Sequence, residues 1–214
     1  MAVSKLWPFK QSSKDHWERV YKKHASTEVG WYQVHPENSL KLINNTGTGT
    51  DCRIIDVGGG TSKLIGQLLD QGYKKLSVLD ISGISIEKAK SQLGEKSSLI
   101  EWIEADITKF NVVEQYDVWH DRAVFHFLTE AGDRKGYINS LNQALKLNGH
   151  LIIATFSLDA PQKCSGLPVV RYCSDTLHDE LGDNFNLVES SEEDHVIPSG
   201  VKQNFIFCRF IKQA

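Results

Sequence analysis

The sequence predicts a three-layer α/β/α sandwich around a seven-stranded, mostly parallel sheet with an antiparallel C-terminal hairpin. From Cys52 onward, short apolar runs alternate with helical patterns. This order is typical of a parallel sheet whose two faces are covered by helices through right-handed crossovers. Near the C-terminus, two extended segments follow one another across a turn, with no helical pattern between them. We expect them to pair as a hairpin at the end of the sheet.

The spacing of apolar residues places each element. Strands are expected at residues 52–57, 75–80, 98–106, 116–121 and 150–157. Helices are expected at residues 61–72, 84–94 and 132–149, each of which ends in a glycine. In the last of these helices, Ile138, Leu141 and Leu145 share one face. The hairpin strands are expected at residues 185–199 and 202–213, with the turn at Pro198, Ser199 and Gly200.

The first fifty residues are predicted to form a separate helical cap or lid. Trp17, Val20, Tyr21 and His24 recur at helical spacing. A second helix is expected to begin after Pro36 and to run to about residue 43, and residues 44–51 (NNTGTGTD) are typical of a flexible joint. We therefore divide the chain into a cap at 1–50 and a sheet domain at 51–214.

Charge and composition exclude several classes of protein. The formal net charge of −3 provides no basic excess for a nucleic-acid partner. No apolar run approaches the roughly 20 residues of a membrane helix, and the first residues lack the apolar stretch of a signal peptide. The four cysteines are scattered without a C-x-x-C pair, so no metal site is expected. The sequence predicts a cytoplasmic protein, either a monomer or a homodimer.

A glycine-rich turn follows the first predicted strand. The strand ends in Asp56, and Gly58, Gly59 and Gly60 precede a helix. Glycines let the backbone turn sharply and approach a ligand closely, and ligands bind at the carboxyl ends of parallel strands. A tight connection between strand and helix, with no ligand, is the alternative interpretation.

Two further carboxylates end the next two strands. Asp80 ends the second strand, about twenty residues past the glycines, where a carboxylate can accept both hydroxyls of a ribose. Asp106 and Ile107 end the third strand, where an acid and an apolar side chain suit the amino group and the ring face of an adenine. A solvated strand end or a helix cap is the alternative for each aspartate alone. Their succession after the glycine turn favours a nucleotide site.

These segments together resemble one enzyme family. The stretches IIDVGGGTSKL, SVLDIS, EADI and YDVWHDRAVFHFL and the late hairpin are similar to the class I S-adenosylmethionine-dependent methyltransferases, from about residue 52 to the end. The resemblance implies that Gly58 and Gly60 cradle the amino-acid part of S-adenosylmethionine. It implies that Asp80 holds the ribose and Asp106 the adenine, while Asp56 orients the loop. Gly59, Ile81, Ile107 and His120 complete the expected cofactor site.

The sequence departs from this family's pattern at one place and leaves two other functions open. Ser62 stands where the third glycine of D-x-G-x-G-x-G is usual. An NAD-dependent oxidoreductase is an alternative, but its G-x-G-x-x-G fingerprint is missed because Lys63 occupies the last glycine position. A module that binds the cofactor without transferring a methyl group is another alternative.

Candidates for the acceptor side lie on three segments. His120 or Asp121, at the end of the fourth strand, is predicted to act as general base. The alternative is that Asp121 pairs with Arg122 while His120 packs beside the cofactor. His126, which follows, is another candidate for the acceptor site.

A long loop and the cap are expected to cover this site. Arg171, in the loop at 157–172, is predicted to clamp an anionic acceptor. Trp31 and Tyr32, in the cap, are predicted to cover the acceptor. We expect a small-molecule acceptor, with protein lysine methylation as the alternative. The Asn/Asp-Pro-Pro-Tyr/Phe motif of amino methyltransferases acting on nucleic acids or glutamine is absent.

Overall fold

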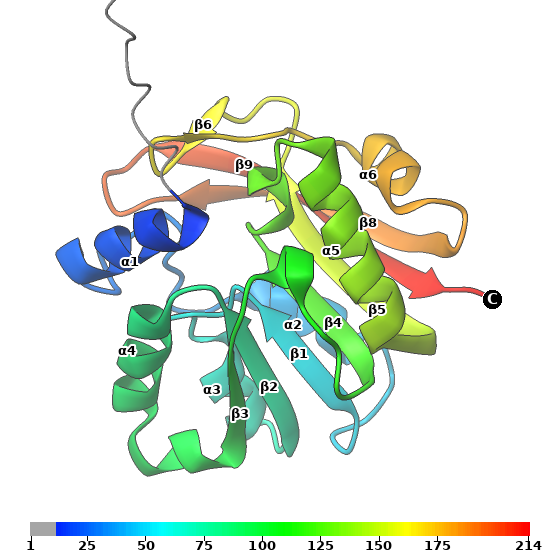
Figure 1. The fold of residues 1–214 in the computed structure, drawn as a ribbon, viewed down its shortest axis with the longest axis horizontal. Coiled ribbons are helices and arrows are strands. Elements are labelled where there is room, and N and C mark those ends of the chain that lie inside the picture. The colour runs from blue at the N-terminus through cyan, green and yellow to red at the C-terminus, as the bar shows by residue number, and fades with distance from the viewer. Residues whose placement is uncertain (1–11) are drawn as a thin grey trace, which may run out of the picture.

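A seven-stranded sheet forms the centre of the protein, which the computed structural model describes over residues 12–214 (Figure 1). Within this range the strand order is β3-β2-β1-β4-β5-β9-β8. The strands are β1 Arg53–Val57, β2 Lys75–Asp80, β3 Ile100–Glu104, β4 Tyr116–Arg122, β5 Leu145–Phe156, β8 Phe185–Val196 and β9 Lys202–Lys212. Strand β9 runs antiparallel to β5 and β8, whereas the other neighbours are parallel. The predicted sheet and its C-terminal hairpin are therefore confirmed.

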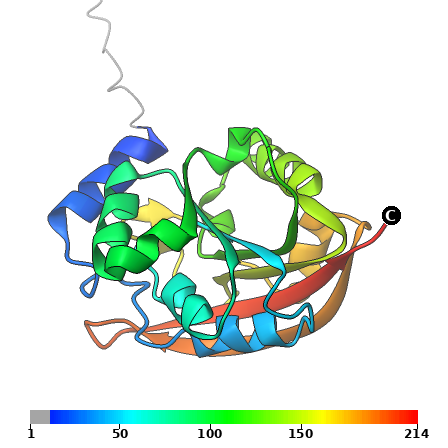
Figure 2. The ribbon, with the colours of Figure 1, turned by 90° about the horizontal axis from the view of Figure 1, so that it is seen from below.

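Helices cover both faces of this sheet. They are α1 Ser13–Lys23, α2 Glu37–Asn44, α3 Leu64–Asp70, α4 Gly83–Leu93, α5 Ala131–Ala144 and α6 Ser174–Leu181. Leu141 of α5 and Leu177 of α6 are fully buried in the core of one face, and Ile43 of α2 and Leu68 of α3 in that of the other. Figure 2 shows α2 and α5 on opposite sides of the sheet. This arrangement confirms the three-layer sandwich.

Helix α5 is shorter, and strand β5 longer, than the sequence predicts. The helix ends at Ala144 and the strand begins at Leu145, so the predicted helix is wrong over residues 145–149. Leu145 pairs with Tyr116 of β4 instead of continuing the helix face. Asn148 has a φ of 60°, a left-handed conformation that a right-handed helix does not accommodate. Apolar spacing did not reveal this change, because Leu141 and Leu145 fit one helix face equally well.

Two short strands and a helix lie in and after the stretch that was predicted as a loop. Strands β6 Lys163–Cys164 and β7 Leu167–Pro168 form a small separate hairpin within 157–172. Helix α6 follows and has no counterpart among the predicted elements. Its start is capped by the Cys173 amide, which donates to Thr176 Oγ1 at 3.0 Å. Leu177 and Leu181 are its two apolar residues, too few to establish a helical period.

The N-terminal segment contributes to the molecule in two different ways. Helix α1 lies beside α4 (Figure 1), where Lys88 Nζ of α4 donates to the backbone carbonyls of Tyr21 and of His24, the latter at 2.9 Å. Helix α2 instead packs into the core against α3 and β5 through Leu42 and Ile43. Of the predicted 1–50 cap, residues 1–11 lie outside the described part of the chain. Over residues 12–214, no helix is long and apolar enough to cross a membrane.

Candidate functional site

A large cavity lies at the carboxyl ends of the parallel strands. It has a volume of about 700 Å³, within the range of small-molecule sites. Gly58 follows β1, Asp80 ends β2 and Ile81 comes directly after it. Asp106 and Ile107 follow β3, and all five residues line this cavity. The structure therefore brings these five predicted residues together, whereas Asp56, Gly59 and His120 line a smaller neighbouring cavity and Gly60 lines neither. Strand β3 ends at Glu104, two residues before the predicted end at Asp106.

The glycine turn requires residues without side chains. Gly58 and Gly60 have φ angles of 67° and 37°, in the left-handed region that favours glycine. A Cβ on Gly58 would lie 2.1 Å from the Val124 side chain. A Cβ on Gly60 would lie 2.7 Å from Asp80 Oδ2 and 2.8 Å from the Tyr21 hydroxyl. Side chains at these positions would fill the space beside the cavity, so the bare backbone is suited to cradle a ligand.

Asp80 presents a buried carboxylate beside this turn. One of its oxygens accepts a hydrogen bond from the Ser82 amide at 2.8 Å. Burial raises the pKa of Asp80 to about 7, since the charged form loses its hydration. Ligand hydroxyls that donate to this carboxylate would stabilise its ionised form. The site thus fits the ribose of a nucleoside cofactor.

Asp106 caps a short helix and also lines the large cavity. Its Oδ1 accepts from the Thr108 amide at 3.0 Å and from the Thr108 hydroxyl at 2.7 Å, which caps the short helix η2 Ile107–Lys109. The same residue lines the large cavity beside the buried Ile107. The acid and the apolar side chain therefore stand together, as an adenine site requires.

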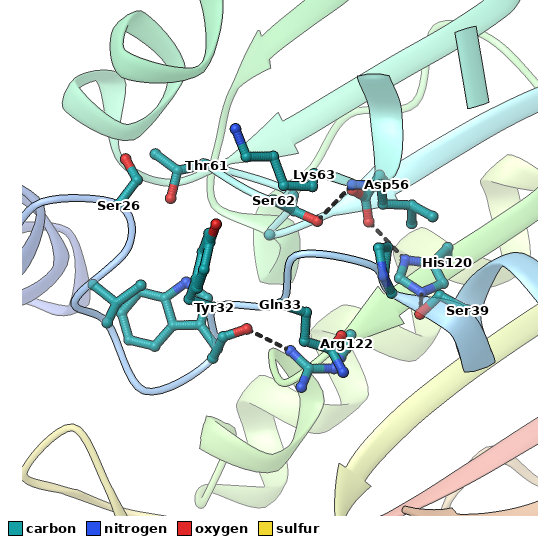
Figure 3. Close-up of a pocket in the computed structure, with 16 residues that line it drawn as sticks. Ser26, Tyr32, Gln33, Ser39, Asp56, Thr61, Ser62, Lys63, His120 and Arg122 are labelled. Carbon is teal, nitrogen blue, oxygen red and sulfur yellow. Dashed lines mark hydrogen bonds and ion pairs between the residues drawn. The ribbon is translucent and has the colours of Figure 1, made fainter. Parts of the chain in front are cut away.

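A hydrogen-bonded chain of three buried side chains lies next to the glycine turn. His120 Nδ1 is 2.7 Å from Asp56 Oδ1, and His120 Nε2 is 2.9 Å from the Ser39 hydroxyl of α2 (Figure 3). All three line a smaller cavity of about 30 Å³ that shares Trp31, Gly58 and Arg122 with the larger one. Both ring nitrogens of His120 are thus engaged, and the ring links the α2 segment to the cofactor turn. No sequence signal pointed to Ser39.

Asp121 does not face either cavity. It is fully buried and accepts hydrogen bonds from the Tyr137 hydroxyl at 2.7 Å and from the amides of Val124 and Phe125 at 2.9 and 3.1 Å. The alternative ion pair between Asp121 and Arg122 is also wrong. The two residues are adjacent on β4, and successive side chains of a strand point to opposite faces. The geometry therefore does not support the predicted role of Asp121 as a general base, because its carboxylate holds together the turn after β4.

Neither His126 nor Arg171 lines either of the two cavities. His126 is fully buried against Phe156, whose amide donates to its Nδ1 at 3.2 Å, and burial lowers its pKa to about 3. The Arg171 guanidinium donates to the carbonyls of Leu158 and Ala160 at 2.6 and 3.1 Å. The geometry therefore does not support the predicted roles of His126 and Arg171 at the acceptor.

The cap contributes aromatic rings to the site. Trp31 lines both cavities and Tyr32 lines the smaller one (Figure 3), as expected for a cover. Trp17 packs against Trp31 and Phe127 with ring centroids 5.6 and 4.9 Å apart, and all three rings line the large cavity. The sequence did not single out Phe127, because an aromatic residue after a buried strand is typical of the hydrophobic core.

Comparison with known proteins agrees with this geometry. The family model described as a methyltransferase domain matches residues 49–207. The malonyl-[acyl-carrier protein] O-methyltransferase of Anoxybacillus flavithermus is 36% identical over 105 residues, which are 48% of this chain and 38% of that protein. The human EEF1A lysine methyltransferase 2 is 25% identical over 165 residues, or 69% of each chain. The chain thus spans less than half the length of the first of these relatives.

Solved structures share the whole fold. An S-adenosylmethionine-dependent methyltransferase from Anabaena variabilis superposes with a TM-score of 0.74 at 14% identity, over 100% of both chains. The N-methyltransferase NodS of Bradyrhizobium japonicum, in complex with S-adenosylhomocysteine, gives a TM-score of 0.70 at 17% identity, over 94% of this chain and all of that one. These matches support a methyltransferase instead of an NAD-dependent oxidoreductase, and they imply that the cofactor is S-adenosylmethionine. The chain belongs to the methyltransferase-domain family and has the fold of the class I S-adenosylmethionine-dependent methyltransferases.

Proposed function

We propose that this protein transfers the methyl group of S-adenosylmethionine to a small-molecule acceptor. One observation carries the choice of acceptor. Trp17 and Tyr21 of α1 line the same cavity as Cys164 and Leu167 of the 157–172 segment. The two expected covers therefore meet over one space, which favours an enclosed pocket over an open groove.

The chain's own residues supply binding and positioning. S-adenosylmethionine, when bound, carries its methyl group on a positively charged sulfur that is already reactive. Asp80 would accept the ribose hydroxyls and the glycine turn would hold the amino-acid end. The aromatic rings of Trp17, Trp31 and Phe127 would exclude water from the cavity. In-line placement and exclusion of water account for most of the rate that such a transfer needs.

Protein lysine methylation is the second candidate. The relatives named above include an O-methyltransferase of an acyl-carrier-protein conjugate and a lysine methyltransferase. The similarity to the lysine enzyme extends over 69% of both chains, which favours keeping this candidate. The aromatic rings that line the large cavity would then form a channel for one extended side chain.

Incubation with radiolabelled S-adenosylmethionine and a cell extract, followed by separation by size, distinguishes the two candidates. We expect label in the small-molecule fraction, and its loss in the Asp80→Ala variant. Label on a single protein band, again lost in Asp80→Ala, would support lysine methylation instead. Label in no fraction would favour a module that binds the cofactor without transferring its methyl group.

We also propose a cytoplasmic location. Cys52, Cys164, Cys173 and Cys208 are all free, and three of them are buried. Unpaired buried thiols are typical of proteins in a reducing compartment. Labelling the unfolded protein with a thiol reagent, directly after lysis, should modify all four cysteines. Two cysteines that resist the reagent because they form a disulfide would contradict this proposal.

A further inference from the structure

Arg122 lines both cavities, and Figure 3 shows it among the residues of the smaller one. Its Nη1 donates to the Trp31 carbonyl at 2.9 Å, and its guanidinium carbon lies 4.7 Å from the centre of the Phe205 ring. Its Nε and Nη2 are buried and have no hydrogen-bond partner among residues 12–214. Burying a charged group without a partner is unfavourable, so an unfilled guanidinium of this kind points to a ligand.

The nearby acidic groups do not accept hydrogen bonds from Nε and Nη2 of Arg122. Glu193 is close enough to act on Arg122 electrostatically, but its two oxygens accept from Gln33 and Asn38 at 2.7 and 2.6 Å. Asp56 is held by His120. The free donors Nε and Nη2 form one edge of the planar guanidinium, and this edge matches the two oxygens of a carboxylate.

On the candidate bases beside Arg122, each atom that could accept a proton already takes part in a hydrogen bond within the protein. Both ring nitrogens of His120 are engaged, and Asp121 is enclosed by three donors. His126 Nδ1 accepts from the Phe156 amide, so the proton of the neutral ring resides on Nε2. A hydroxyl or an ammonium acceptor has to lose a proton during or around transfer. A carboxylic acid, with a pKa near 4, arrives ionised at neutral pH.

We propose that Arg122 binds a carboxylate of the acceptor and that this carboxylate is the group methylated, which yields a methyl ester. The inference rests on the proposed function and specifies its substrate class as small carboxylic acids. One carboxylate oxygen forms the new bond to the methyl carbon. The carbon–sulfur bond breaks, and its electron pair stays on sulfur. The negative charge of the acceptor and the positive charge of the sulfonium both disappear, and no proton is transferred.

Alkali treatment tests the chemical identity of the product. The protein is incubated with tritiated S-adenosylmethionine, labelled on the methyl group, and the small-molecule fraction of a cell extract. Methyl esters release volatile methanol in mild alkali, whereas N-, S- and ether-linked methyl groups do not. We expect volatile, alkali-released label. Alkali-stable label in the small-molecule fraction would overturn the ester inference and leave the proposed function standing. Label in no fraction would overturn both.

Substitutions of arginines test the assignment of the residue. We expect Arg122→Gln to reduce ester formation at least about 100-fold at limiting extract, because a buried charge pair is lost. Arg122→Lys keeps the positive charge but loses the two parallel donors of the guanidinium, so it should retain less than about a tenth of the wild-type rate. Arg171→Gln is the matched control, since Arg171 lies outside the lining of both cavities and donates to backbone carbonyls.

Two further measurements separate binding from folding. The melting temperature of Arg122→Gln should not fall, because the substitution removes a buried charge that lacks an acidic partner. Its affinity for S-adenosylhomocysteine should stay close to that of the wild type in calorimetry. Ester formation that survives Arg122→Gln, or that is lost in Arg171→Gln, would show that the acceptor is held elsewhere.

Discussion

At the scale of single residues, the site depends on carboxylates whose surroundings differ. Asp80 is buried with a pKa of about 7, so that near neutral pH it is divided between its two protonation states. Only the ionised form can accept hydrogen bonds from both hydroxyls of a ribose. Cofactor binding should therefore be linked to the titration of this one group.

We predict that the affinity for S-adenosylhomocysteine weakens as the pH falls below about 7, by up to about tenfold for each pH unit. Asp80→Asn should bind more weakly at pH 8 but with a flat profile, because an amide does not titrate. The free energy of unfolding of the ligand-free protein depends on pH in the opposite direction. Asp80 has a raised pKa, so its contribution to stability is lost as the pH rises from about 4 to 7. Calorimetry from pH 5.5 to 8 measures the first effect; parallel profiles for the two proteins would contradict it.

The chain of Asp56, His120 and Ser39 carries a second prediction at this scale. We propose that His120 is a positioning residue that fixes the cofactor turn to α2. Ser39→Ala would leave His120 Nε2 buried without a partner and should lower the free energy of unfolding by about 1–3 kcal/mol. It should also weaken cofactor binding without changing the shape of the pH–rate profile. A profile that loses one ionisation in Ser39→Ala would instead indicate that His120 acts as a base.

At the scale of elements, helix α1 covers the cofactor cavity and depends on α4 for its position. Lys88 donates to the carbonyls of Tyr21 and His24 at the C-terminal end of α1, where a cation also complements the helix dipole. Tyr21 in turn lies against the glycine turn. Lys88 thus holds the end of the helix that places Tyr21 against the glycine turn.

We predict that Lys88→Ala weakens the affinity for S-adenosylhomocysteine about two- to tenfold, mainly through faster dissociation, because the loss of two hydrogen bonds from a charged donor loosens α1. Lys90→Ala is the control on the same helix, since Lys90 contacts the exposed Glu87. Stopped-flow measurement of dissociation compares the two variants. Equal rates would mean that α1 does not retain the cofactor.

The elements also show where sequence reasoning succeeded. Strands β1, β2 and β4 are short and mostly buried on both faces, so their positions were predictable, and with them Asp56, Asp80 and the glycine turn. Arg122 could be placed on its strand but not assigned its neighbours, because Trp31 and Phe205 are distant in sequence. The roles of Ser39 and Arg122 depend on packing between elements, and no local pattern encodes such packing.

At the scale of the whole molecule, one helix of the N-terminal segment belongs both to the hydrophobic core and to the candidate site. Helix α2 is part of the core through Leu42 and Ile43, and it also contributes Ser39 to the site. We therefore expect the described part of the N-terminal segment to unfold together with the sheet. A ligand that binds between β1, β2 and the cap should stabilise the cap and the sheet together.

We therefore predict one cooperative unfolding transition that S-adenosylhomocysteine moves as a whole. At a concentration 100 times its Kd, the ligand adds about 2.7 kcal/mol of stability. For a chain of this length, the melting temperature should rise by about 5–10 °C.

NAD should cause no shift, because Lys63 stands in place of the last glycine of its fingerprint. Asp80→Ala should lose most of the shift, since the ribose hydroxyls would lack their acceptor. Differential scanning calorimetry measures these shifts. A shift with NAD but none with S-adenosylhomocysteine would contradict the cofactor assignment, and two separate transitions would show that the cap unfolds by itself.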